Sequence, residues 1–258
     1  MRSEVCIASR GELLHGILNL PDNMSDDGRY PALILCHGFT GHCEEEIFNR
    51  IAEESCRSGF AVLRFDFAGS GKSTGSFVEC TSLNGWREDI LAAAEWLSGR
   101  EGIDRNQLTL LGHSMGGAAA LAASESGEFC AIVGWAPAVD VRAVFRRILG
   151  VEAYDGLLRQ PAGQYTSAYD GAEYTINGQF LREFEEADIP EAVISSGRTR
   201  VLLLTGDADA VVDTGPAEDL SRRIPDRVTS VTLHGEDHSM MRRHTTVVMQ
   251  TIGFLRDI

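Results

Sequence analysis

The pentapeptide Gly-His-Ser-Met-Gly at 112–116 most constrains the fold of this 258-residue chain, because it places a serine where a strand becomes a helix. Residues 107–111 before it form a short apolar stretch typical of a strand, and residues 118–123 after it are helix-forming. A turn this sharp exposes the serine hydroxyl, and it needs glycines because side chains at their positions would collide with neighbouring backbone. Ser114 is therefore the candidate nucleophile. The alternative is a glycine-rich turn with an incidental serine.

A serine hydroxyl is a weak nucleophile at neutral pH, so Ser114 needs a histidine base and a carboxylate that orients this base. In chains with this type of turn, the acid and then the histidine follow the serine. Two later apolar strand patterns run into such residues, the first into Asp207 and Asp209 and the second into His234 and His238. Catalytic groups gather at the carboxyl ends of parallel strands, so all four residues are candidates.

Further blocks of sequence are His-Gly-Phe-Thr-Gly-His (37–42), Asp-Phe-Ala-Gly-Ser-Gly-Lys-Ser (66–73), Ala-Pro-Ala (136–138) and Gly-Asp-x-Asp-x-Val-Val (206–212). Together with the pentapeptide, they resemble the small bacterial cinnamoyl and feruloyl esterases of the α/β-hydrolase superfamily. The resemblance covers nearly the whole chain. Monoacylglycerol lipases, carbon-carbon bond hydrolases and lactonases share much of the same pattern, and a fold alone does not define a substrate.

The resemblance implies a role for each candidate. Asp209 is the second aspartate of its loop, which is the acid in this superfamily, and His238 is the base because its Gly-x-x-His loop resembles the family's. The backbone N–H groups of Phe39, after the His-Gly pair, and of Met115, after the serine, are the expected oxyanion-hole donors. A Ser114–His238–Asp209 triad is the prediction.

Strand patterns alternate with helix patterns along the chain. The strands are expected at 5–8, 13–20, 32–36, 61–65, 107–111, 131–135, 200–205 and 227–233, and the first two form an antiparallel hairpin. Segments 45–57 and 82–97 carry apolar stripes at helical spacing. The predicted architecture is an α/β-hydrolase fold, with an eight-stranded, mostly parallel sheet, helices on both of its faces and a lid insertion.

The interval 139–197 is too long for a loop and too apolar for a linker, so it is interpreted as a lid on a core of 1–138 and 198–258. Four of the five tyrosines of the chain fall inside it. Tyr169 and Tyr174 lie near the turn signals of a hairpin and are expected to line the substrate pocket. A tyrosine suits an aromatic acyl group that carries a phenol, because it combines an apolar ring with a hydroxyl.

Composition and the absence of certain motifs disfavour several classes of partner. The net charge of −15 disfavours nucleic acid and anionic membrane surfaces. The sequence has no nucleotide-binding loop, no dinucleotide fingerprint and no His/Cys cluster at metal-ligand spacing, so no cofactor and no metal are expected. It also has no apolar leader and no apolar run of membrane length, which predicts a cytoplasmic enzyme. The oligomeric state stays open, a homodimer included.

The sequence thus predicts a serine carboxylic-ester hydrolase with an acyl-enzyme intermediate, acting on small aromatic esters of the hydroxycinnamate type. A general carboxylesterase or monoacylglycerol lipase is an alternative with the same triad. A carbon-carbon bond hydrolase or an acyltransferase would use the same residues as well. A ligand receptor that keeps the fold without turnover is the alternative outside enzymes.

Overall fold

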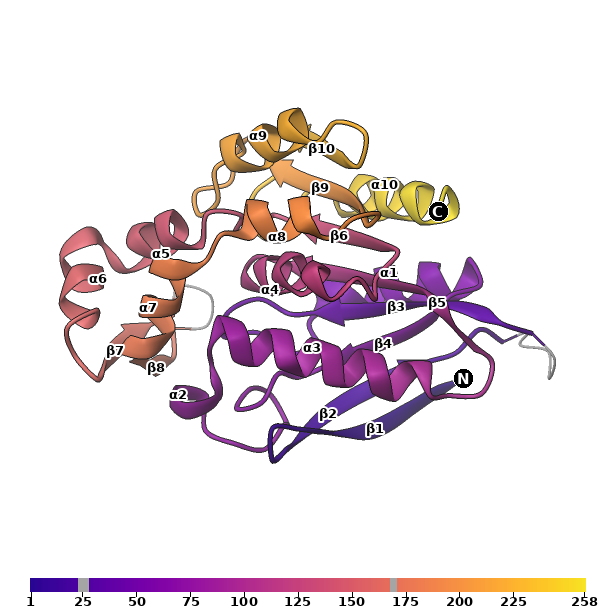
Figure 1. The fold of residues 1–258 in the computed structure, drawn as a ribbon, viewed down its shortest axis with the longest axis horizontal. Coiled ribbons are helices and arrows are strands. Elements are labelled where there is room, and N and C mark those ends of the chain that lie inside the picture. Colours follow the sequence, from indigo (N-terminus) through magenta and orange to yellow (C-terminus); the bar gives the residue numbers. More distant parts are fainter. Residues whose placement is uncertain (23–27, 168–170) are drawn as a thin grey trace.

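The computed structural model describes residues 1–22, 28–167 and 171–258. Within them, eight strands form one sheet in the order β1-β2-β4-β3-β5-β6-β9-β10 (Figure 1). Their bounds are β1 (Arg2–Ser9), β2 (Glu12–Asn19), β3 (Tyr30–Cys36), β4 (Ala61–Phe65), β5 (Ile103–His113), β6 (Ala131–Trp135), β9 (Arg200–Gly206) and β10 (Val228–Leu233). β2 pairs antiparallel with β1 and β4, and the other neighbours are parallel. The predicted α/β-hydrolase fold is confirmed.

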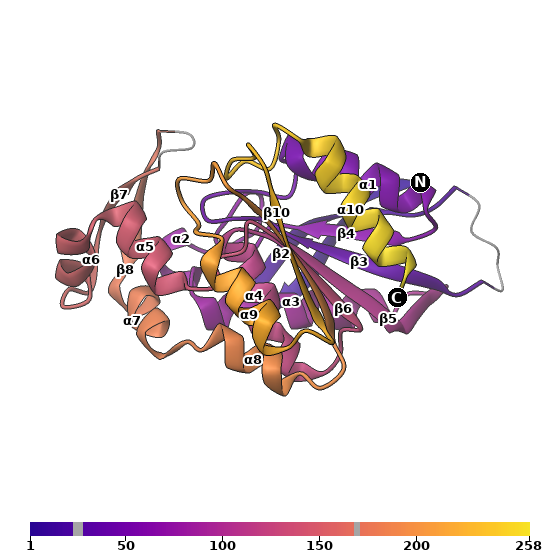
Figure 2. The ribbon, with the colours of Figure 1, turned by 90° about the horizontal axis from the view of Figure 1, so that it is seen from above.

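The central strands are apolar at nearly every position because helices cover both faces of the sheet. In β3, Ile34 and Cys36 face one layer of helices, whereas Leu33 and Leu35 face the other. One layer holds α1 (Glu46–Arg57) and α10 (His244–Arg256) (Figure 2). The opposite layer holds α3 (Leu83–Ser98), α4 (Met115–Ala123), α8 (Ile189–Ser195) and α9 (Gly215–Arg223), and the short helices α2 (Phe77–Cys80) and η1 (Ser124–Ser126) lie in connections.

The segment between β6 and β9 departs from the alternation of one strand with one helix. It contains α5 (Val141–Leu149), α6 (Val151–Leu157), the antiparallel hairpin of β7 (Ala162–Thr166) and β8 (Glu173–Asn177), α7 (Gly178–Glu186) and then α8. α5, α6, α7 and the hairpin lie together at one end of the molecule (Figure 1), while α8 packs against α4. The residues 139–197 are called the insert below.

A buried carboxylate ties the sheet edge to α3. Asp89 is fully buried and accepts hydrogen bonds from Ser9 Oγ (2.6 Å) and from Arg10 Nε and Nη2 (3.0 and 2.9 Å). Its second oxygen also accepts the backbone N–H of Ala68 (3.0 Å), in the loop that follows β4. One side chain thereby joins the β1–β2 turn, α3 and a loop at the carboxyl edge of the sheet.

We expect Asp89→Ala to lower the free energy of unfolding by about 3 kcal/mol, because it leaves the Arg10 guanidinium and other buried donors without their partner. Urea denaturation measures this loss. The control is Glu125→Ala, which removes the exposed pair with Arg87 (3.5 Å) and should cost less than about 1 kcal/mol. Equal losses in the two variants would contradict the role given to Asp89.

Candidate active site

Ser114 occupies a turn that few residues other than glycine tolerate. Its φ is 54° and its ψ is −119°, between the end of β5 and the start of α4. The backbone is held there from both sides, because the Ser114 N–H donates to the Trp135 carbonyl (2.9 Å) and its own carbonyl accepts the Ala138 N–H (3.1 Å). Such strained conformations persist only where the surrounding structure enforces them, and they concentrate at functional sites.

The glycines on each side of Ser114 are required by close backbone contacts. A Cβ atom at Gly116 would lie 2.2 Å from the carbonyl oxygen of His37, and one at Gly112 would lie 2.3 Å from that of Gly116. Real Cβ atoms do not come this close to backbone oxygens. The turn therefore packs directly against the end of β3, which carries the expected oxyanion loop.

Two side chains form a chain of hydrogen bonds with this serine. His238 Nε2 lies 3.0 Å from Ser114 Oγ, and His238 Nδ1 lies 2.8 Å from Asp209 Oδ2. The other oxygen of Asp209 accepts the N–H groups of Val211 (2.7 Å) and Val212 (2.9 Å). Burial acts to raise the pKa of Asp209, but the hydrogen bonds from His238 and the backbone outweigh it and lower the pKa, so the carboxylate is ionised.

The competing candidates pair with each other instead. His234 Nδ1 lies 2.7 Å from Asp207 Oδ2, and the imidazole is 90% exposed. Asp207 also accepts the N–H of Gly235 (2.6 Å), and this bond and His234 lower its pKa. The structure thus brings Asp209 and His238 to Ser114 and leaves the other aspartate and histidine at the surface.

A buried glutamate fixes the loop that carries His238. Glu236 is fully buried, and its carboxylate accepts the backbone N–H groups of Asp237 (3.3 Å), Arg242 (3.1 Å) and Arg243 (2.5 Å). These donors lie just before and after the turn at 238–241. The loop is therefore closed on itself around one carboxylate at the start of α10.

The loop after β3 lies against the nucleophile. Gly41 N–H donates to the Gly38 carbonyl (3.1 Å), which closes a turn with Phe39 and Thr40 at its centre. A Cβ atom at Gly38 would lie 3.4 Å from Ser114 Cβ, so the loop touches the serine. Met115 is the first residue of α4, where backbone N–H groups have no partner within the helix. The two expected oxyanion donors, Phe39 N–H and Met115 N–H, thus flank Ser114.

A pocket of about 760 Å³ opens above these residues. Gly38, Ser114 and His238 form its floor, and α5 and the β7–β8 hairpin contribute Ile148 and Tyr165 to its walls. Thr40 Oγ1 also lies 3.4 Å from the hydroxyl of the buried Ser167, which connects the hairpin to the loop after β3. The insert therefore forms one side of the pocket.

Of the tyrosines expected in this pocket, the structure describes only Tyr174, and a different tyrosine lines the pocket. Tyr174 pairs across the hairpin with Tyr165, and its ring packs on Phe77 at 4.8 Å rather than on the pocket floor. Tyr165 lines the pocket and lies 5.6 Å from the ring of Phe39. Tyr169 lies outside the described residues. Tyr165 could have been chosen from the sequence only by pairing it with Tyr174 across the predicted hairpin.

Glu45 is a pocket residue that the sequence reasoning missed. It precedes α1, and a Cβ atom at Gly41 would lie 2.8 Å from its Oε1. Burial raises the pKa of Glu45 to about 7, although a hydrogen bond from the His42 backbone favours the charged form. No cationic side chain of the described ranges pairs with it. Its position just beyond the carboxyl end of β3 was the available signal.

We expect Glu45→Gln to stabilise the protein at pH 8 but not at pH 4.5. The carboxyl is protonated in the folded state up to a pKa of about 7 but ionises near 4.5 when unfolded, so the stability of the native protein falls as pH rises between these values. After discounting for partial exposure, the gain at pH 8 is about 1–2 kcal/mol. Urea denaturation of both proteins across this range measures it, and a pH-independent difference would contradict the assignment.

One group of potential metal ligands lies behind the oxyanion loop. His15, Cys43 and Asp66 offer ligand atoms that all lie within 4.8 Å of one another. The carboxylate of Asp66 already accepts the N–H groups of Cys43 (2.6 Å) and Lys72 (2.9 Å), and His15 Nδ1 lies 3.2 Å from it. Burial raises the pKa of the Cys43 thiol, so it is protonated. These contacts describe a hydrogen-bonded loop anchor rather than a metal site.

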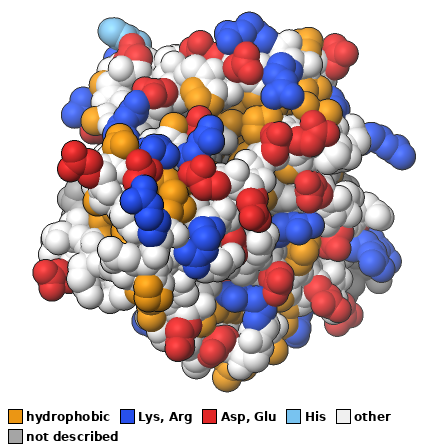
Figure 3. All heavy atoms as spheres, turned by 60° about the vertical axis from the view of Figure 1, so that its left-hand side comes forward, with side chains coloured by type: hydrophobic (Ala, Val, Ile, Leu, Met, Phe, Trp, Pro, Cys, Tyr) orange, Lys and Arg blue, Asp and Glu red, His pale blue; other side chains and the backbone are white. Residues whose placement is uncertain are grey.

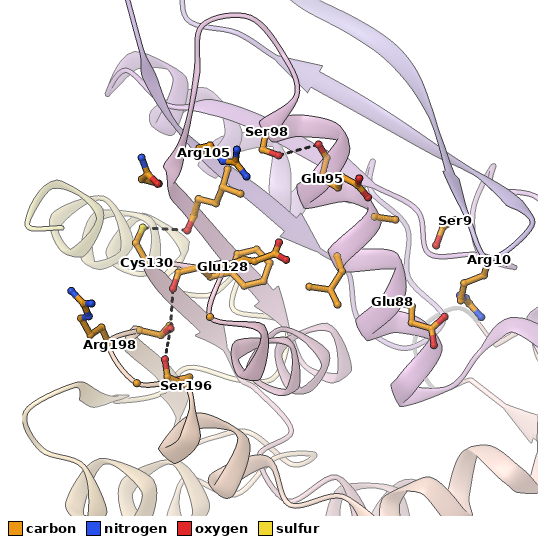
Figure 4. A pocket seen from close by; sticks show the side chains of 18 of the residues that line it. Ser9, Arg10, Glu88, Glu95, Ser98, Arg105, Glu128, Cys130, Ser196 and Arg198 are labelled. Atoms are coloured by element: carbon orange, nitrogen blue, oxygen red, sulfur yellow. Dashed lines mark hydrogen bonds between the residues drawn. The ribbon is translucent and has the colours of Figure 1, made fainter.

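Figure 4 shows a larger hollow of about 1110 Å³, and Ser114 is not among the residues that line it. It is lined by α3, the end of β1 with the turn after it, the first half of β5 and the segments that precede β6 and β9. Charged side chains of both signs surround it, among them Glu88, Arg105, Glu128 and Arg198 (Figure 4).

The face of the molecule that carries the insert also has side chains of both charges, with apolar patches between the acidic and the basic ones (Figure 3).

The strand order, the strained serine turn and the Ser114–His238–Asp209 arrangement define the class of the protein as an α/β-hydrolase. The chain belongs to the Hydrolase_4 family, described as "Serine aminopeptidase, S33", whose sequence profile matches residues 30–162, about half of the chain. Nothing in the described part of the chain forms a helix with the length and apolar character of a membrane span.

The chain is also similar to individual proteins. The mitochondrial palmitoyl-protein thioesterase ABHD10 of Mus musculus is 28% identical over 223 residues, covering 84% of this chain and 71% of that protein. The structure of Est1E from Butyrivibrio proteoclasticus with bound ferulic acid has a TM-score of 0.86 at 25% identity and covers 98% of both chains. An uncharacterized 31.7 kDa protein of Escherichia coli is 34% identical over 89 residues, and the match spans only 30% of its length.

Proposed function

We propose that the protein hydrolyses carboxylic esters through an acyl-enzyme intermediate. The observation that carries the proposal is the continuous chain of hydrogen bonds from Asp209 through His238 to Ser114 Oγ, at 2.8 and 3.0 Å. In this mechanism His238 takes the hydroxyl proton while Ser114 attacks the ester carbonyl, and Asp209 stabilises the imidazolium that forms. The N–H groups of Phe39 and Met115 hold the tetrahedral oxyanion.

The remaining steps of the reaction use the same groups. His238 gives its proton to the leaving alcohol, and the acyl group stays on Ser114. A water molecule, deprotonated by His238, then attacks the acyl-enzyme, and His238 returns the proton to Ser114 Oγ as the bond to the acyl group breaks and the acid leaves. No cofactor or metal takes part in this scheme, which relies only on the side chains and backbone groups of the pocket.

Substitution of the triad tests this mechanism. Ser114→Ala should lower kcat roughly a million-fold, by analogy with other triad serines. Asp209→Asn should lower it roughly ten-thousand-fold, because an amide favours the wrong tautomer of His238. The matched control is Asp207→Asn in the same loop, which should keep kcat within about threefold because Asp207 pairs with the exposed His234. Initial rates with a nitrophenyl ester measure all three.

These kinetic results can also reject the assignment. If Asp207→Asn lost more activity than Asp209→Asn, the acid would be the other carboxylate of the pair. If Ser114→Ala kept more than about a hundredth of wild-type activity, the nucleophile would lie elsewhere, since triad serines contribute far more than that. Covalent labelling by a fluorophosphonate, lost in Ser114→Ala, separates a hydrolase from a ligand receptor on the same fold.

For the acyl group we propose a small aromatic acid of the hydroxycinnamate type. Two features support this: the rings of Tyr165 and Phe39, which both line the pocket and lie 5.6 Å apart, and the likeness to an esterase structure with bound ferulic acid. Tyr165 is the proposed ring contact, with Tyr174 beside it on the same face of the hairpin and Tyr169 also proposed to contact substrate. The cytoplasmic location stays a prediction.

A second candidate is thioester hydrolysis with the same triad. It is favoured by the 28% identity with palmitoyl-protein thioesterase ABHD10 over 84% of this chain. The two candidates differ in the acyl group and the leaving atom, not in the catalytic residues. A panel of methyl ferulate, a short aliphatic ester and an S-palmitoyl thioester distinguishes them by the ratio of their kcat/KM values.

Within this panel, we expect Tyr165→Leu to lower kcat/KM for methyl ferulate about fivefold, because an aromatic contact contributes on the order of 1 kcal/mol beyond area burial. The kcat/KM value for the short aliphatic ester should change little. Tyr174→Leu is the matched variant on the neighbouring strand and should cost less, since that ring packs on Phe77. Equal losses for both esters would show that these tyrosines only hold the insert together, and the assignment would revert to a general carboxylesterase.

A further inference from the structure

His113 precedes the nucleophile in the chain and makes contacts that the mechanism above does not use. It is the last residue of β5, and its ring forms part of the pocket wall. Its Nε2 lies 2.8 Å from the backbone carbonyl of His238. The two imidazole rings are 5.1 Å apart, and a Cβ atom at Gly38 would lie 3.2 Å from His113 Nδ1. One ring therefore touches both the base and the oxyanion loop.

The carbonyl partner determines the protonation of this ring. A carbonyl oxygen only accepts hydrogen bonds, so His113 Nε2 must carry the proton and donate it. Burial and the neighbouring His238 lower the pKa of His113 to about 3, so the ring is neutral at physiological pH. A neutral donor can hold the His238 backbone without opposing the positive charge that forms on the His238 ring.

The loop of His238 is anchored independently at its base. Glu236 holds the backbone at 237, 242 and 243, which leaves the segment between them to be fixed by other contacts. His238 lies in that segment, and Met240 within it has a positive φ of 55°. The hydrogen bond from His113 is placed at the residue whose ring must stay 3.0 Å from Ser114 Oγ.

We propose that His113 is a positioning residue, which holds the His238 backbone by a hydrogen bond so that the imidazole stays aligned between Ser114 and Asp209. The inference rests on the proposed serine mechanism. It assigns to the residue before the nucleophile a role in aligning the base, and it predicts an effect on kcat with little effect on substrate binding.

The test compares His113→Gln with His113→Leu. The two side chains have similar size, but only glutamine can donate from a position like that of Nε2. We expect the leucine variant to lower kcat about ten- to a hundredfold, with KM changed less than about threefold, because a hydrogen bond is lost and the carbonyl is left unpaired. The glutamine variant should keep kcat within about fivefold of wild type. His234→Leu, at the exposed histidine, is the control and should leave kcat unchanged.

A spectroscopic readout is independent of turnover. The proton shared by His238 and Asp209 gives a low-field NMR signal, and this signal should shift or broaden in His113→Leu and persist in His113→Gln. Circular dichroism and thermal melting establish that both variants fold. Equal loss of kcat in the two variants, a change confined to KM, or an unchanged low-field signal in the leucine variant would each overturn the proposal. Failure of the wild type to hydrolyse esters or to be labelled by a fluorophosphonate would instead reject the proposed function.

Discussion

The left-handed backbone of Ser114 is the constraint on which the site depends. A non-glycine residue at φ 54° carries strain, and that strain is offset by backbone hydrogen bonds to β6 and to the segment after it. The glycines on both sides allow the turn to approach the end of β3, which is the neighbour of β5 in the sheet. The order of the strands thus determines that the nucleophile and the oxyanion loop meet.

Two histidines near the site, His37 and His113, carry no charge at neutral pH. Burial lowers the pKa of His37 to about 4 and that of His113 to about 3, so both rings are neutral donors and acceptors. His37 accepts the N–H of Phe67 (3.1 Å) and lies beneath the oxyanion loop. Asp209 is the ionised partner of His238 through one carboxylate oxygen, and its other oxygen accepts two backbone N–H groups. Positive charge can therefore form on His238 against a single carboxylate.

The fold and the serine turn could be predicted because they rest on short-range signals, whereas Asp209 and His238 were assigned because their loops resemble those of α/β-hydrolases. The period of the apolar residues predicts all eight strands of the main sheet, and the glycines around Ser114 are explained by the steric needs of the turn. The pocket walls could not be predicted in the same way. Tyr165 and Glu45 reach the pocket through a hairpin register and a helix start that depend on tertiary packing, and Tyr174 turns to Phe77 although it neighbours Tyr165.

The proposed mechanism assigns catalysis and the choice of acyl group to different parts of the chain. The proposed triad and oxyanion donors lie at strand ends of the core, whereas the insert contributes Ile148 and Tyr165 to the pocket wall. The two parts meet where Phe39 stacks on Phe180 at 5.5 Å and where Thr40 approaches Ser167. In the proposed mechanism Phe39 contributes a backbone donor to one part and a ring to the other, so a substitution that changes the ring is expected to alter the choice of acyl group while its N–H group remains in place. A site built this way can change substrate through the insert without rebuilding its catalytic groups.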